Sequence, residues 1–76
     1  MNDARRKELE RAIVLIRDAA AIIENGASEE QDYFDGMPEN LQGSEKGERA
    51  QEVAEELETV SGELEEFQDR IEELTA

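Results

Sequence analysis

The stretch that decides the fold is residues 50–74, AQEVAEELETVSGELEEFQDRIEEL. Its apolar residues alternate at spacings of three and four through four heptads without an exception. They are Ala50, Leu57, Leu64 and Ile71 at position a, and Val53, Val60, Phe67 and Leu74 at position d. Such a repeat predicts a coiled-coil-like helix whose a/d seam packs against another helix. With Ser44 as its N-cap, we expect one helix over residues 45–75, in which Gly47 and Gly62 each cost about 1 kcal/mol relative to alanine.

A second amphipathic helix is predicted for residues 3–25. Its apolar residues share one face, namely Leu9, Ile13, Ile16, Ala20 and Ile23, widened by Ala12, Ala19 and Ile22. Asn2 or Asp3 is suited to cap its start, and Gly26 is suited to end it after Asn25. Because the apolar stripe is broad, we expect this helix to contact more than one neighbouring helix.

Residues 27–43 form the predicted connection. Ser28 followed by Gln31 has the form of a capping box, which predicts a short helix over residues 29–35. Pro38 prevents that helix from continuing and favours a further turn before the long helix. The connection is therefore expected to be structured and to contain a short helical turn.

The connection is also apolar, because it holds Tyr33, Phe34, Met37 and Leu41. These side chains either plug the open end of the hairpin or anchor a partner. We expect Phe34 and Leu41 to be inside, and Tyr33 and Met37 to be candidate partner contacts.

The predicted fold is a single all-α domain, residues 1–76, folded as an antiparallel helical hairpin. In this hairpin the basic start (Arg5, Arg6 and Lys7) lies near the acidic end (Glu66, Asp69, Glu72 and Glu73). A chain of this length buries only about 60% of its unfolded surface, and two helices leave the broad apolar stripe uncovered. We therefore expect a homodimer that forms a four-helix bundle, or alternatively a helix-rich partner.

Composition excludes most site chemistry. The chain has no Cys and no His, so disulfides, thiolate chemistry, zinc sites and imidazole-dependent catalysis are excluded. The acids around Gly36 do not match a calcium loop, because Gln31, Tyr33 and Gln42 occupy ligand positions. We predict no enzyme activity, no catalytic residue, no cofactor and no metal ligand.

Charge and hydropathy restrict the binding partners and the cellular location that we expect for the protein. A net charge of −14 argues against direct binding to nucleic acid or to an anionic membrane. No apolar run approaches the length of a membrane span, and the start lacks the apolar run of a secretion signal. A cytoplasmic protein is expected.

The negative charge belongs to the second half of the chain. Residues 26–76 hold 17 acids and 3 bases, whereas residues 1–25 hold five of each. In the long helix the acids occupy outer positions, and the candidate partner-binding residues among them are Glu52, Glu55, Glu58, Glu65, Glu66, Asp69 and Glu72. Carboxylates one turn apart are separated by about 5.4 Å along the axis, close to the phosphate repeat of a nucleic-acid strand. The face is therefore either a nucleic-acid mimic that docks on a basic protein or simply a solvated helix surface.

Residues 34–48, FDGMPENLQGSEKGE, resemble a motif of small, acidic, phage- and prophage-encoded proteins. The motif is (Tyr/Phe)-Asp-x-(Leu/Met)-Pro-Glu-x-(Leu/Ile)-Gln-x-Ser-Glu-(Arg/Lys)-Gly-Glu. The frame of those proteins is also similar, with a basic start, one helix, this loop and a long acidic heptad helix. A departure is the apolar run at residues 19–23, where such proteins carry more charge. The resemblance implies a helical hairpin of mobile-element origin in a bacterial host cell, and it implies no catalytic or ligand residue.

Together these features predict a non-enzymatic interaction protein. It would bind and block a host or defence protein, such as one that handles nucleic acid, through its acidic helix face, with Tyr33 or Met37 as an anchor. The alternative is a self-associating coiled-coil module that serves a phage assembly or replication complex.

Overall fold

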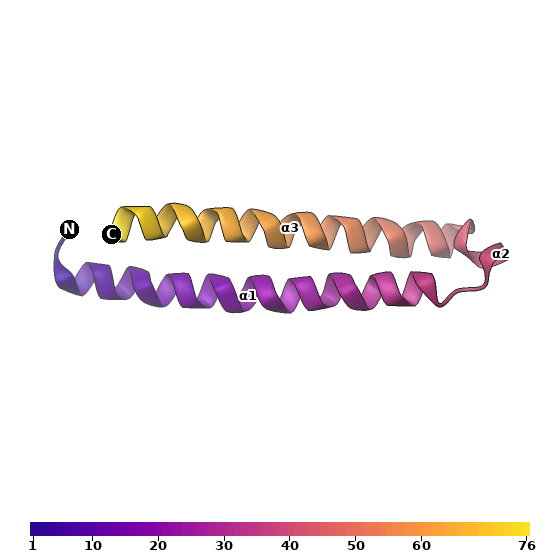
Figure 1. Ribbon diagram of the computed structural model, residues 1–76, viewed down its shortest axis with the longest axis horizontal. Coiled ribbons are helices and arrows are strands. Elements are labelled where there is room, and N and C mark those ends of the chain that lie inside the picture. Colours follow the sequence, from indigo (N-terminus) through magenta and orange to yellow (C-terminus); the bar gives the residue numbers. More distant parts are fainter.

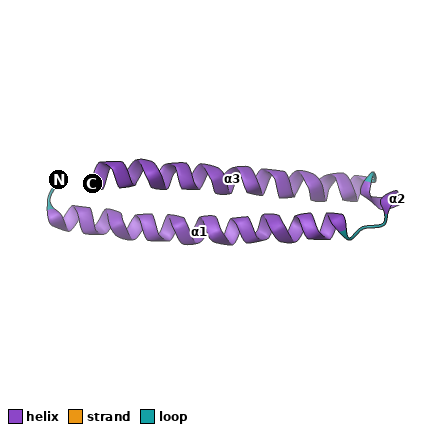
Figure 2. Ribbon diagram, viewed as in Figure 1, coloured by secondary structure: helices purple, strands orange, loops and turns teal.

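The computed structural model describes residues 1–76 and shows an antiparallel helical hairpin (Figure 1). Helix α1 spans Asp3–Asp35, the one-turn helix α2 spans Glu39–Gln42, and α3 spans Glu45–Thr75. The molecule is a rod with principal extents of 59 × 14 × 13 Å. Both termini lie at one end of the rod and α2 lies at the other, and the non-helical segments are confined to these ends (Figure 2). The predicted all-α hairpin with a short helical turn in its connection is confirmed.

Helix α1 is longer than its sequence predicts, and the expected end at Asn25 is corrected to Asp35. The helix passes through Gly26 without a positive φ angle, and Ala27 beyond it is buried against α3. Residues 29–35 are therefore the last turns of α1 rather than a separate short helix. The packing of Ala27 outweighs the roughly 1 kcal/mol by which glycine disfavours a helix interior.

Side chains cap the starts of both long helices. The Asn2 Oδ1 atom accepts a hydrogen bond from the Arg5 N–H at 2.8 Å, and the Ser44 Oγ atom accepts one from the Gly47 N–H at 3.3 Å. Each bond satisfies an N–H that has no partner within its own helix. Ser44 is thus confirmed as the N-cap of the helix over residues 45–75.

Small residues dominate the contact between α1 and α3. The buried residues are Ile13, Ala20 and Ala27 on α1, and Ala50, Ala54 and Ser61 on α3, while Gly47 at the start of α3 lies against α2. Midway along the rod, the Ser61 hydroxyl donates a hydrogen bond of 3.1 Å to the carbonyl oxygen of Ala20. Because all of these side chains except that of Ile13 are short, the two backbones can approach closely.

The contact shifts the seam of α3 from the predicted a/d rows, where a row means residues seven apart on one side of a helix. The a row, which begins at Ala50, faces α1 as expected. The second row that packs against α1 is not the d row but the row of Ala54 and Ser61. Four of the predicted seam residues are half-buried: Leu57, Val60, Leu64 and Ile71. Phe67 and Leu74, at the C-terminal end of the d row, lie exposed.

Candidate interaction surfaces

The acidic face of α3 consists of seven predicted residues: Glu52, Glu55, Glu58, Glu65, Glu66, Asp69 and Glu72. All seven side chains are exposed. By helical spacing they occupy three adjacent rows, which begin beside α1 and continue to the back of α3. The structure therefore places the predicted acids together on one continuous surface of the rod.

Few cations neutralise this acidic face. Glu52 pairs with Arg49 at 3.4 Å, and Glu72 pairs with Arg17 of α1 at 3.5 Å. The other five acids of the face have no ion pair. Both pairs are largely exposed, so each contributes at most about 1 kcal/mol. The face thus keeps most of its negative charge.

The expected match between the basic start and the acidic end takes a different form. The Arg6 Nε atom donates to the carbonyl oxygen of Thr75 at 3.1 Å, while its guanidinium also pairs with Asp3. Arg5 and Lys7 form no ion pair. Carbonyls at a helix C-terminus lack partners and carry partial negative charge. The Arg6 side chain therefore binds the backbone at the end of α3 rather than its acidic side chains.

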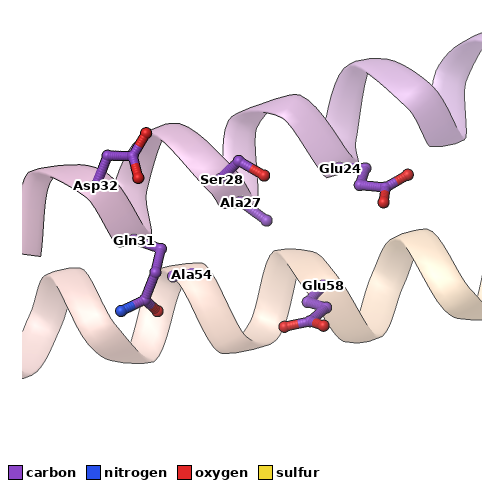
Figure 3. A pocket seen from close by; sticks show the side chains of 7 residues that line it. All are labelled: Glu24, Ala27, Ser28, Gln31, Asp32, Ala54 and Glu58. Carbon is purple, nitrogen blue, oxygen red and sulfur yellow. The ribbon is translucent and has the colours of Figure 1, made fainter. Parts of the chain in front are cut away.

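A groove of about 240 Å³ lies between α1 and α3 beside the acidic face (Figure 3). Its lining includes the carboxylates of Glu24, Asp32 and Glu58, without a basic residue. No group of three or more acidic side chains in the molecule is arranged to hold a metal ion. The three carboxylates of the groove extend the acidic surface of α3 onto α1.

The connection forms a second groove, of about 420 Å³, at the α2 end of the rod. Tyr33 and Met37, the two predicted anchor residues, both line it, together with Leu41 and Lys46. The Lys46 Nζ atom lies 5.9 Å from the centre of the Tyr33 ring, within the range of a cation–π contact. Phe34 is half-buried, as expected. Leu41 was also expected inside, but it is 47% exposed at the rim of this groove.

A third surface, which the sequence-based interpretation did not delineate, is apolar. We define the apolar face by its residues: Ala12, Leu15, Ala19, Ile22 and Gly26 of α1, and Val53, Val60, Phe67 and Leu74 of α3. Leu15 is 64% exposed and Ile22 is 71% exposed. The signal was present in the broad stripe of the first helix, but the shift of the α3 seam was needed to complete the face.

Contacts between the helices place both halves of the apolar face on the same side of the rod. Tyr33 continues the row of Ala12, Ala19 and Gly26, and it contacts Lys46, which begins the d row of α3. A Cβ atom built on Gly26 would meet the Leu57 Cδ1 atom at 3.7 Å. The Arg17–Glu72 pair and the groove at Glu24 and Glu58 lie in rows on the other side of the contact. One side of the rod is therefore apolar and the other is acidic.

No helix of the hairpin combines the length and the apolar character needed to cross a membrane. Comparison with known proteins finds no match, since no family model, no curated protein and no solved structure corresponds to this sequence.

Proposed function

We propose that this protein is a non-enzymatic interaction protein that docks the acidic face of α3 on a basic surface of another protein. The observation that carries the proposal is the exposure of all seven acids on a continuous surface that has only two ion pairs. Like charges one turn apart destabilise a helix. A function that requires negative charge accounts for this cost.

The geometry of α3 supports a partner that normally binds nucleic acid. Its 31 residues form a helix about 46 Å long, with carboxylates at intervals of about 5.4 Å. A rigid row of anions at this spacing resembles a phosphate backbone and complements a groove lined by Lys and Arg. The resemblance of residues 34–48 to a motif of phage-encoded proteins favours a host or defence protein as the target, which docking would block.

Charge reversal tests the docking surface. We expect the wild-type protein to capture a basic protein from bacterial lysate at about 0.15 M salt, where exposed charges more than about 8 Å apart are largely screened. Added duplex DNA should compete with this capture. The triple variant Glu52→Lys, Glu58→Lys, Glu66→Lys should capture nothing.

A matched control separates the face from bulk charge. The variant Glu10→Lys, Asp18→Lys, Asp35→Lys changes three exposed acids of α1 and alters the net charge equally. It should retain capture. Equal loss in both triple variants, or no capture by the wild type, would contradict docking by the acidic face.

The apolar face favours a second candidate function, a coiled-coil module that assembles with itself or with a phage assembly or replication protein. Exposed Leu15, Ile22, Phe67 and Leu74 form a larger apolar surface than scattered single residues would. In this case the acids serve solubility alone. The triple reversal on α3 should then leave assembly intact, as measured by sedimentation equilibrium.

A further inference from the structure

We propose that a second copy of this chain covers the apolar face, in a dimer whose two-fold axis runs along the rod. Both α2 turns then lie at the same end, and α3 of each copy lies over α1 of the other. This proposal specifies the partner and the arrangement for the assembly function, and it does not depend on docking by the acidic face.

The size of the apolar face fits a stable dimer. From Lys46 to Leu74 the d row of α3 extends about 42 Å, and two helices side by side are about 20 Å wide. The face therefore measures about 840 Å². Stable protein interfaces bury about 800 Å² on each partner. Contact along the whole face would thus provide an interface of standard size.

The central rows of the two halves of the face have complementary side-chain sizes. On α1 the row nearest α3 is small, with Ala12, Ala19 and Gly26, and Leu15 and Ile22 flank it on the outer side, whereas the d row of α3 is large. An axis along the rod places each large row on a small one. An axis across the rod would place the small row of α1 on the same row of the other copy and the d row on the other d row, which leaves voids along the small row. Packing therefore favours the arrangement with both α2 turns at one end.

The register of the hairpin supports interdigitation in this arrangement. The Ser61–Ala20 hydrogen bond puts these two residues at the same level, and a two-fold axis along the rod keeps both copies level. Phe67, six residues after Ser61, is then level with residue 14 of the other copy, between Ala12 and Ala19. By the same count, Val60 falls between Ala19 and Gly26. The large side chains of each copy thus meet gaps between the small ones.

Charges at the rim are also complementary. Residues 26–76 contain only three bases, Lys46, Arg49 and Arg70, and all three lie in the d row of α3 or in the row beside it. In the proposed dimer Arg49 lies about three residues from the level of Glu29 in the other copy, and Arg70 lies equally near Glu8. The separation along the axis is about 4.5 Å. The acidic faces point away from the interface, which keeps the two sets of like charges apart.

Spin labels at α2 test the arrangement directly. The chain has no Cys, so Asn40→Cys, an exposed position in α2, accepts a single label. We expect sedimentation equilibrium to give twice the 8.6 kDa chain mass and double electron–electron resonance to give an inter-label distance far below the 59 Å rod length. A distance close to the rod length would overturn the arrangement. A monomer at all concentrations up to about 1 mM, or a higher oligomer, would overturn the proposal.

A matched pair of variants tests the face. Ile22→Glu places a charge in the proposed interface, and Val14→Glu makes the same change on the acidic side of the rod, where Val14 is also exposed. Ile22→Glu should weaken dimerisation by at least about 100-fold, whereas Val14→Glu should leave it unchanged. Equal effects would overturn the proposal. If Ile22→Glu fails to fold, the label distances in Asn40→Cys alone decide. Charge reversal on the acidic face should not affect any of these measurements, so the two proposals fail separately.

Discussion

Substituting Gly47 by alanine tests the close approach of α2 to the first turn of α3. A Cβ atom at Gly47 would overlap the carbonyl oxygen of Gln42 and lie 2.6 Å from that of Leu41. Both are backbone atoms, so no side-chain rotation relieves the overlap. The one-turn helix α2 would have to move as a unit.

The magnitude follows from two opposing effects. Replacing glycine by alanine inside a helix stabilises it by about 1 kcal/mol, whereas overpacking costs about 1–3 kcal/mol. Gly62→Ala has only the first effect, because no atom lies within 4 Å of its Cβ position. Its melting temperature should rise by about 4–8 °C. Gly47→Ala should therefore be less stable than Gly62→Ala by about 1–3 kcal/mol.

Thermal unfolding followed by far-ultraviolet circular dichroism measures this difference. All variants should be compared at one protein concentration, because self-association would make the melting temperature depend on it. Gly26→Ala is a second control, since its nearest neighbour is the flexible Leu57 side chain at 3.7 Å. If Gly47→Ala stabilised the protein as much as Gly62→Ala, the close packing of α2 on α3 would be refuted.

Three further predictions concern the contact between the helices and the charge. Ser61→Ala should change the free energy of unfolding, measured by chemical denaturation, by no more than about 1 kcal/mol. It removes the hydroxyl donor, while the Ala20 carbonyl keeps its place in the hydrogen bonding of its own helix. Ser61→Leu should lower the free energy of unfolding by about 1–3 kcal/mol through overpacking. Arg17→Ala should cost under about 1 kcal/mol, and a double-mutant cycle with Glu72→Ala should give a coupling equally small, since the pair is exposed. Raising the salt concentration from about 0.05 to 0.5 M should raise the melting temperature, because screening weakens the self-repulsion of a chain with charge −14; a constant value would contradict this account.

The heptads predicted α3 and the hairpin because an unbroken a/d repeat has few alternatives to a packed helix. The end of α1 was harder to predict, since Gly26 followed by a capping box has the same local pattern as a real helix end. What distinguishes this site is the contact of Ala27 with α3, which is a tertiary interaction. Local patterns therefore located the elements but not the point where packing prolongs one of them.

The surfaces show a similar limit. Exposure of the acids on α3 followed from their outer heptad positions, whereas the exposure of Phe67 and Leu74 did not. A prediction based on side-chain size places large apolar residues in the seam. In this hairpin Ala54 and Ser61 occupy the contact, because small residues let the backbones approach closely. The choice of the rows that pack together therefore depends on the distance between the helices, and the pattern of one helix does not give that distance.

The separation of surfaces on the rod connects the two proposals. A dimer formed through the apolar face, with its axis along the rod, points the two acidic faces outward on opposite sides. Each dimer would then present two equivalent docking surfaces. Two linked surfaces bind a pair of basic sites more tightly than one surface binds a single site, provided that the sites match their spacing. A variant that fails to dimerise, such as Ile22→Glu, should therefore bind an oligomeric target much more weakly while its affinity for one isolated basic site stays the same.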